Sequence, residues 1–138
     1  MRLSAAECRR RAAGADHAVL ATLHPERGVD TVPVCFVLDD DVVATPIDAV
    51  KPKSGRPLQR VVNLHRDPRA TLLAEQWDPN DWSRLWWVRL SLRRSTEDEP
   101  TLARCEAALR AKYPQYAEAS FAALLTLRIV DVTGWSAT

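Results

Sequence analysis

The feature that most restricts the fold is a succession of short apolar segments separated by turn-forming residues, HAVLATLHPERGVDTVPVCFVLDDDVVATPI, residues 17–47. Alternating and β-branched apolar residues favour strands, and PERG and DDD are typical of the turns that join them. The strand-like segments are HAVLATL, TVPVCFVL and VVATPI. Because the turns between them are short, we expect three consecutive strands that form an antiparallel meander.

Three later segments also have the composition of strands. RATLLAEQW and LWWVRLSLRRS are separated by the turn DPNDWSR, and FAALLTLRIVDVTGW lies near the end of the chain. The strand period of two divides LWWVRLSLRRS into a face with Trp86, Val88, Leu90 and Leu92 and a face with Trp87, Arg89, Ser91 and Arg93.

Three segments are expected to be helices. SAAECRRRAAGA begins with a capping box formed by Ser4 and Glu7. RPLQRVVNLHRD has Pro57 in its expected first turn and ends before Pro68. STEDEPTLARCEAALRAKYP has an acidic first turn, which complements the helix dipole. Many antiparallel strands with few helices predict a mainly β (α+β) barrel flanked by helices, as a single domain over residues 1–138.

Composition narrows the class of protein. The 138 residues carry a net charge of +1, which argues against a dedicated nucleic-acid binder. No apolar run approaches the roughly 20 residues that span a bilayer, and the N-terminal segment lacks the apolar core of a secretory signal. Cys8, Cys35 and Cys105 are odd in number and widely spaced, so we expect free thiols in a reducing cytoplasm.

Motifs for protein-based catalysis are absent from the sequence. There is no G-x-S-x-G elbow, no Cys/His pair with zinc-ligand spacing, no complete calcium loop and no glycine-rich phosphate loop. The sequence therefore predicts no metal site and identifies no catalytic residue.

A cluster of cations precedes and enters the second expected helix. Lys51, Lys53 and Arg56 lead into it, and Arg60 and Asn63 follow Arg56 at the i+4 and i+7 positions of one helix face. Free backbone amides and the positive end of the helix dipole favour anions at such a point. The cluster is either a phosphate site or a solvated basic face.

Four of the five tryptophans, Trp77, Trp82, Trp86 and Trp87, fall within one expected hairpin. Such aromatics either pack in a core or wall a ligand site or a subunit interface. Adjacent Trp86 and Trp87 point to opposite faces of their strand, so at least one of them should meet a ligand, a helix or another chain.

The order of VVATPID, the basic segment ending in NLHRDPRATLLA, and DWSRLWWVRL resembles the pyridoxamine 5'-phosphate oxidase-like split-barrel proteins, and within them the branch of deazaflavin-dependent enzymes that use coenzyme F420. The resemblance covers most of the chain. It implies an antiparallel split β-barrel of the FMN-binding type and a homodimer with the cofactor in a groove between subunits. The resemblance further implies these cofactor-binding residues: Thr45, Pro46, Lys51, Lys53, Arg56, Arg60, Asn63 and Trp77.

The expected function is therefore that of an oxidoreductase that binds F420 at a dimer interface and transfers a hydride to a small unsaturated organic substrate. The alternatives are an FMN-dependent oxidoreductase of the same fold and a non-catalytic flavin- or deazaflavin-binding protein. One departure from the family pattern concerns the residues that follow WWVR in the same expected strand. Relatives often carry glycine there, whereas this chain continues LSLRRS with Ser91, which changes the backbone approach that glycine permits.

Overall fold

The computed structural model describes residues 1–48, 57–118 and 121–138. Within these ranges, seven strands form one antiparallel sheet in the order β2-β1-β5-β6-β7-β4-β3. The strands are β1 (Ala18–His24), β2 (Gly28–Val34), β3 (Val37–Asp39), β4 (Val42–Asp48), β5 (Arg69–Gln76), β6 (Trp86–Arg94) and β7 (Phe121–Ser136). The helices are α1 (Ala5–Gly14), α2 (Gln59–Arg66) and α3 (Glu99–Lys112), with two short 3-10 helices, η1 (Trp82–Arg84) and η2 (Pro114–Tyr116). The predicted mainly β class with flanking helices is confirmed.

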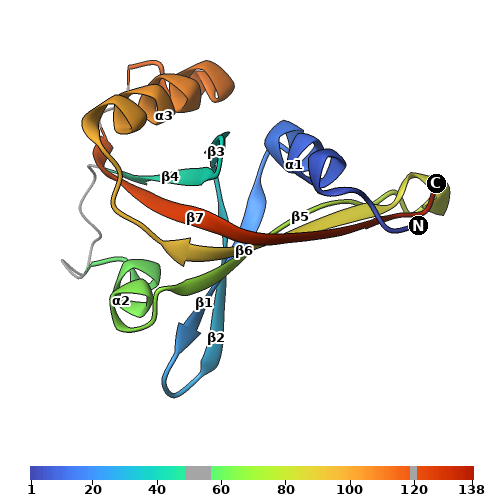
Figure 1. The fold of residues 1–138 in the computed structure, drawn as a ribbon, viewed down its shortest axis with the longest axis horizontal. Helices are drawn as coiled ribbons and strands as arrows, with labels where there is room; N and C mark the ends of the chain where they lie inside the picture. Colours follow the sequence, from blue (N-terminus) through green and yellow to red (C-terminus); the bar gives the residue numbers. More distant parts are fainter. Residues whose placement is uncertain (49–56, 119–120) are drawn as a thin grey trace.

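The two edge strands of the sheet, β2 and β3, are consecutive in the chain and separated only by Cys35 and Phe36. A flat sheet would hold its edges far apart, so this short connection requires the sheet to curl until the edges approach (Figure 1). No ladder joins β2 to β3 in the part of the chain that the structure describes. The result is a barrel that is split along one side.

The predicted three-strand meander is wrong, because TVPVCFVL is two strands and not one. At the break, the Phe36 side chain is fully buried. Its backbone N–H donates to the Tyr113 hydroxyl at 3.1 Å, and its carbonyl accepts from Lys112 Nζ at 3.0 Å. Side chains at the end of α3 thus satisfy the peptide groups that a continuous strand would have paired, and the chain is free to change strand partner.

The alternation predicted for β6 is confirmed. Val88, Leu90 and Leu92 are at most 2% exposed, whereas Arg89 and Arg93 on the other face are exposed. The buried face of the sheet carries the main core, and a smaller core lies where Cys105 and Leu109 of α3 pack on β3 and β4. These two residues therefore belong to the surface that attaches α3 to the barrel.

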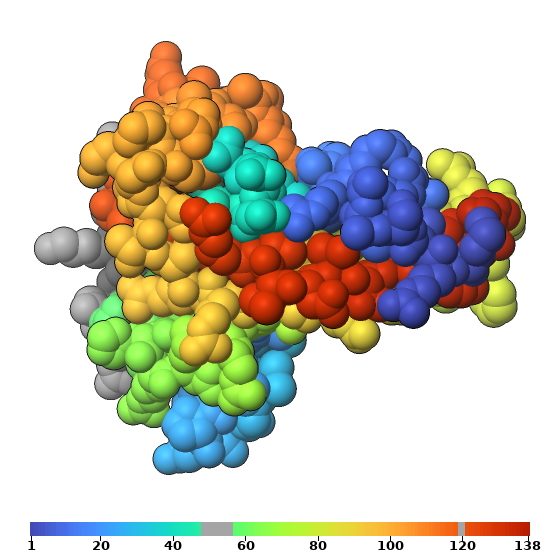
Figure 2. Space-filling model, viewed as in Figure 1, coloured from blue at the N-terminus to red at the C-terminus, as the bar shows by residue number. Residues whose placement is uncertain are grey.

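The distal parts of β5, β6 and β7 extend beyond the barrel as an arm (residues 73–90 and 131–138) that carries η1 at its tip (Figure 1). Helix α1 lies along β7 on one face of this arm, as Figure 2 shows in blue against red. Gly134 permits the close approach, because a Cβ there would lie 2.7 Å from Cys8 Sγ. The opposite face of the arm, with Trp87 and Trp135 paired across the strands, has no helix over it in the described chain.

Three helix starts were predicted, two correctly. Helix α3 begins at Glu99 with the predicted acidic first turn. Helix α1 begins after Ser4, whose hydroxyl accepts from Glu7 N–H at 3.1 Å, as the capping box requires. Helix α2 begins at Gln59, so the expectation that Pro57 lies in its first turn is wrong. Leu58 has an extended ψ of 137°, which postpones the first helical turn until Gln59.

Candidate functional site

A pocket of about 270 Å³ lies where the first turn of α2 meets the β1–β2 hairpin. Its lining consists of Thr22, Arg27, Asp30, Thr31, Val32, Gln59 and Arg60. Arg60 is the one predicted cofactor-binding residue among them. We call this cavity the α2 pocket. It has room for a phosphate group and part of the chain attached to that phosphate.

Arg60 enters this pocket with an unused donor. Its Nε is buried and has no hydrogen-bond partner among the described residues. A buried donor left unpaired costs about 1–3 kcal/mol, more when it belongs to a charged group. Leu58, the residue that caps α2, supplies no side-chain acceptor to the first-turn amides. An anion that reached this point would find an unpaired guanidinium N–H and an uncapped helix start.

Asp30 sets the charge of the pocket. Arg27 donates to both of its carboxylate oxygens at 2.8 Å, and Asn63 donates to Oδ2 at 2.9 Å. The bond from Arg27, followed by that from Asn63, holds the pKa of Asp30 well below its ordinary value. Asp30 is therefore anionic at neutral pH and balances the charge of Arg27, which leaves the charge of Arg60 without a carboxylate partner in the lining.

Asn63 holds the helix in place over this pocket. It is fully buried, and its amide donates to Thr22 Oγ1 at 2.9 Å as well as to Asp30. Its carbonyl oxygen accepts from Gln59 Nε2 at 2.8 Å. Both amide hydrogens are thus used within the protein. The direct cofactor contact that the resemblance implies for Asn63 stays a prediction, and it would have to replace one of these bonds.

Thr45 and Pro46 lie on β4, opposite Leu125 and Leu124 of β7. Thr45 is 2% exposed and Pro46 is buried. Neither residue lines the α2 pocket, so the structure does not bring them together with Arg60 at that cavity. Their approach to a cofactor stays a prediction.

Trp77 lies just beyond the far end of β5, with its side chain 56% exposed and its ring 5.9 Å from that of Trp82. Strand β5 starts beside α2 and has 8 residues, which span roughly 26 Å at about 3.3 Å each. Within one chain, therefore, α2, which carries Arg60, and Trp77 lie at opposite ends of β5. Figure 1 shows α2 beside the start of this strand. The three other predicted residues, Lys51, Lys53 and Arg56, lie outside the described residues.

Sequence reasoning missed six residues that the structure places in the α2 pocket, namely Thr22, Arg27, Asp30, Thr31, Val32 and Gln59. The sequence does show opposite charges three residues apart here, with Arg27 in the PERG turn and Asp30 just after it. The position of this pair beside α2 was not visible, because it depends on how β1 pairs with β5.

Among the described residues, no group of three or more His, Cys, Asp or Glu side chains is arranged to hold a metal ion. All three cysteines are free thiols, as the sequence predicted, and Cys8 and Cys105 are buried. No helix in the described ranges is both long and apolar enough to cross a membrane.

No protein-family model matches the chain, and no curated protein sequence matches it significantly. Solved structures do match over nearly the whole length. An FAD-binding protein from Mesorhizobium loti has a TM-score of 0.72 at 15% identity, with 97% of this chain and 93% of that chain covered. An FMN-binding protein from Syntrophomonas wolfei has a TM-score of 0.68 at 15% identity, with coverage of 95% and 88%.

A third match is a Corynebacterium glutamicum protein named as a candidate pyridoxamine 5'-phosphate oxidase, with a TM-score of 0.61 at 13% identity and coverage of 97% and 90%. At such low identity these matches establish the fold. The chain has the split-barrel fold of these proteins, and its structural neighbours include FAD-binding, FMN-binding, haem-binding and pyridoxamine phosphate oxidase-like proteins.

Proposed function

We propose that this protein is an oxidoreductase that binds coenzyme F420, or alternatively FMN, at a dimer interface and passes a hydride to a small unsaturated organic substrate in the cytoplasm. The observation that carries the proposal is the buried Nε of Arg60 in the α2 pocket, which has no hydrogen-bond partner within residues 1–48, 57–118 and 121–138. The FAD- and FMN-binding proteins among the structural neighbours support a flavin-type ligand for this fold.

The residues present suit the phosphate that these cofactors carry on their ribityl chain. Arg60 offers a charge-assisted hydrogen bond to a phosphate oxygen, and the uncapped start of α2 offers backbone N–H groups. Asp30, anionic at neutral pH, offers an acceptor for a hydroxyl group. When bound, the cofactor would supply the hydride chemistry, and the protein would supply position and electrostatics.

The proposed homodimer follows from the separation of Trp77 and Arg60. If both residues serve one cofactor, they have to come from two chains, because β5 separates them within one chain. The face of the arm that α1 leaves uncovered carries Leu73 and Trp135, which are 38% and 37% exposed. A second copy seated there would bury these apolar side chains and bring the tip of its arm towards the first copy's α2.

The test compares Arg60→Ala with Arg66→Ala, an exposed arginine in the last turn of the same helix. Both variants remove one positive charge from α2, so a difference between them reports direct contact. Titrations with F420 and with FMN, followed by fluorescence, should show binding weakened roughly ten- to a hundredfold by Arg60→Ala and little changed by Arg66→Ala. Equal binding by the two variants would refute the assignment of the α2 pocket.

Binding and turnover are separate questions for the loaded protein. An oxidoreductase oxidises reduced cofactor when an acceptor is added, whereas a non-catalytic binding protein retains it unchanged. The rate of reoxidation of reduced F420, with and without a panel of unsaturated acceptors, distinguishes the two. Retention of reduced cofactor with every acceptor would favour the binding protein.

A further inference from the structure

A second pocket lies away from α2, between α1 and the tip of the arm. Its volume is about 480 Å³, within the range of small-molecule sites, which is roughly 300–1,000 Å³. Residues from α1, β5, η1 and β6 line it, among them Arg10, Arg11, Gln76, Ser83, Arg84 and Trp86. We call it the α1 pocket. The proposed F420 site does not use it.

The charged side chains in this lining are all arginines, and no carboxylate side chain of the described residues joins them. Arg10 and Arg11 share a single carboxylate, that of Glu7, which accepts from Arg10 Nε at 2.9 Å and from Arg11 Nε at 2.8 Å. These bonds hold the pKa of Glu7 at about 2, so it is ionised at neutral pH. One carboxylate balances one of the two guanidinium groups, and the other charge is in excess.

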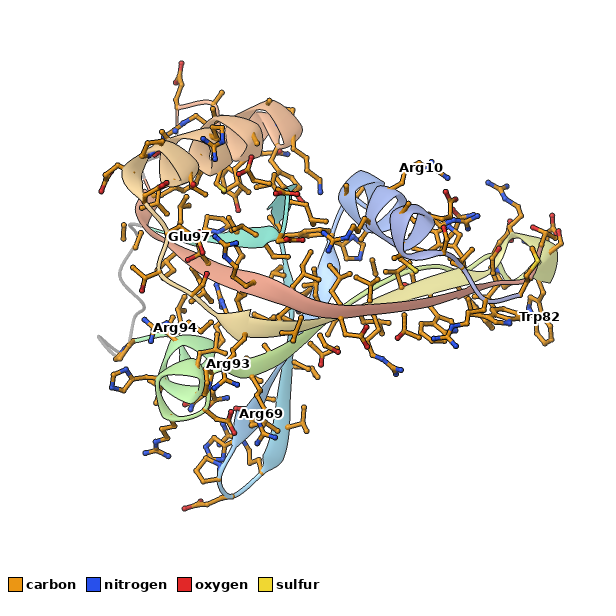
Figure 3. The ribbon with its side chains drawn as sticks, in the orientation of Figure 1. Arg10, Arg69, Trp82, Arg93, Arg94 and Glu97 are labelled. Carbon is orange, nitrogen blue, oxygen red and sulfur yellow. The ribbon has the colours of Figure 1, made fainter. Side chains whose placement is uncertain are left out.

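Arg84 borders the pocket from η1 and is only loosely paired. Asp78 Oδ2 lies 3.8 Å from Arg84 Nη1, which is within ion-pair distance but beyond hydrogen-bond distance, so this weak ion pair leaves the Arg84 guanidinium able to hydrogen-bond a second carboxylate. Figure 3 labels Arg10 on the outer surface of α1 and Trp82 at the tip of the arm. Guanidinium groups from two separate elements thus border one cavity.

An indole forms part of the wall and is fixed in orientation. Trp86 Nε1 donates to Gln76 Oε1 at 3.1 Å, and Gln76 Nε2 donates to the Arg84 carbonyl at 3.3 Å. The Arg11 guanidinium lies 5.6 Å from the centre of the Trp86 ring. A flat ligand could therefore stack on Trp86 or on the guanidinium plane of Arg11 without any rearrangement of the hydrogen bonds that hold the indole.

We infer that the α1 pocket binds a small aromatic molecule that carries a carboxylate. The carboxylate would pair with Arg11 and Arg84, and the ring would lie against Trp86. A guanidinium matches a carboxylate with two parallel hydrogen bonds, and a cavity with excess positive charge and a fixed aromatic wall selects for both parts of such a ligand.

The probe for this inference is salicylate, with salicylamide as its uncharged counterpart. The protein is labelled with ¹⁵N in its tryptophan indoles, and the Trp86 signal is assigned from its loss in Trp86→Phe. Salicylate should shift that signal saturably, and salicylamide should bind at least roughly tenfold more weakly, because it lacks the charge that the arginines recognise.

The variants Arg11→Gln and Arg84→Gln should each weaken salicylate binding roughly tenfold. Arg104→Gln on α3 is the matched control and should leave it unchanged, since Arg104 pairs with Asp39 at a different place on the surface. Arg84 is exposed and its loss should leave the fold intact, so that variant remains informative even if Arg11→Gln folds poorly. Equal shifts with salicylamide, a shift that does not saturate, or unchanged binding in Arg84→Gln would overturn the inference.

Discussion

Asn63 on α2 donates a hydrogen bond to the carboxylate of Asp30 on β2, across 33 residues of sequence, at 2.9 Å. The same amide group donates to Thr22 on β1. A single buried side chain therefore attaches α2 to two strands and fixes the helix start at which the cofactor is proposed to bind.

Replacing Asn63 by Ala should lower the free energy of unfolding by about 2–3 kcal/mol, because the buried hydroxyl of Thr22 and the half-buried carboxylate of Asp30 lose their donor. His65→Ala, on the exposed side of the same helix, should change it by no more than about 0.5 kcal/mol. Urea unfolding of both variants measures the difference. Similar losses in the two would mean that Asn63 contributes helix propensity and not attachment.

The lowered pKa of Asp30 makes its contribution to stability dependent on pH. In the range where the native carboxylate is ionised and the unfolded one is protonated, the unfolded state binds more protons, so stability rises with pH. The difference in stability between the wild type and Asp30→Asn should be full at neutral pH and should shrink as the pH falls below about 4, the ordinary value for Asp.

Urea unfolding between pH 7 and pH 2 provides the measurement for Asp30. Glu75→Gln, which removes an exposed carboxylate from β5, controls for the change in net charge. A difference between wild type and Asp30→Asn that stays constant over this range would contradict the ion-pair account.

Gly134 should tolerate no side chain, because a Cβ would lie 2.7 Å from Cys8 Sγ and 3.1 Å from the Trp87 carbonyl oxygen. We expect Gly134→Ala to displace α1 and cost about 1–3 kcal/mol. Gly14→Ala has open space around the new methyl group and should be neutral or stabilise by up to about 1 kcal/mol. Thermal unfolding of both variants tests the pair, and equal effects would show that α1 does not depend on this contact.

Three arginines stand side by side on one face of the sheet, since Arg69, Arg93 and Arg128 are direct partners across β5, β6 and β7. Arg69 pairs with Asp67 and Arg128 with Glu97, both at 2.7 Å. Figure 3 labels Arg69 and Arg93. Unlike Arg69 and Arg128, Arg93 forms no ion pair with a carboxylate of the described chain. Like charges directly opposite one another destabilise a sheet.

Arg93→Thr should therefore raise the free energy of unfolding by about 0.5 kcal/mol at low ionic strength, and the gain should fall at high salt as the repulsion is screened. Arg94→Thr, one residue on and on the opposite face, is the control for the gain in strand propensity. A gain that is equal in both variants and insensitive to salt would rule out repulsion as the cause.

The proposed homodimer should be visible by light scattering at micromolar concentration. Leu73→Glu places a charge on the uncovered face of the arm and should weaken self-association at least roughly tenfold. Ala107→Glu adds the same charge to an exposed position on α3 and should leave it unchanged. A wild-type monomer at these concentrations would remove the basis for a site between subunits.

The strands with strict alternation could be predicted from the sequence. In β6, every second residue from Val88 to Leu92 is apolar. This local alternation is sufficient to predict which face of the strand packs in the core. The break at Phe36 could not be predicted, because TVPVCFVL is apolar throughout, and what ends the strand is a pair of contacts from Lys112 and Tyr113, more than 70 residues away.

The residues of the candidate site also divide into those that a local sequence signal predicts and those whose position depends on distant contacts. Arg60 was identified because a cation at a helix start is a local signal. Asn63 was expected to face a ligand, since a polar residue three positions after an arginine reads as part of an exposed surface. Its burial depends on Thr22 and Asp30, which only the tertiary structure places beneath it.

The curvature of this barrel depends on the covalent chain at Cys35 and Phe36. Every strand pairing that the structure records would survive a cut between β2 and β3, because these two strands pair only with β1 and β4. New termini placed there by circular permutation would release the two edges from each other while leaving the hydrogen-bonded order of the sheet unchanged. A permuted chain would therefore test whether the curled shape of the sheet depends on this connection or is maintained by the core alone.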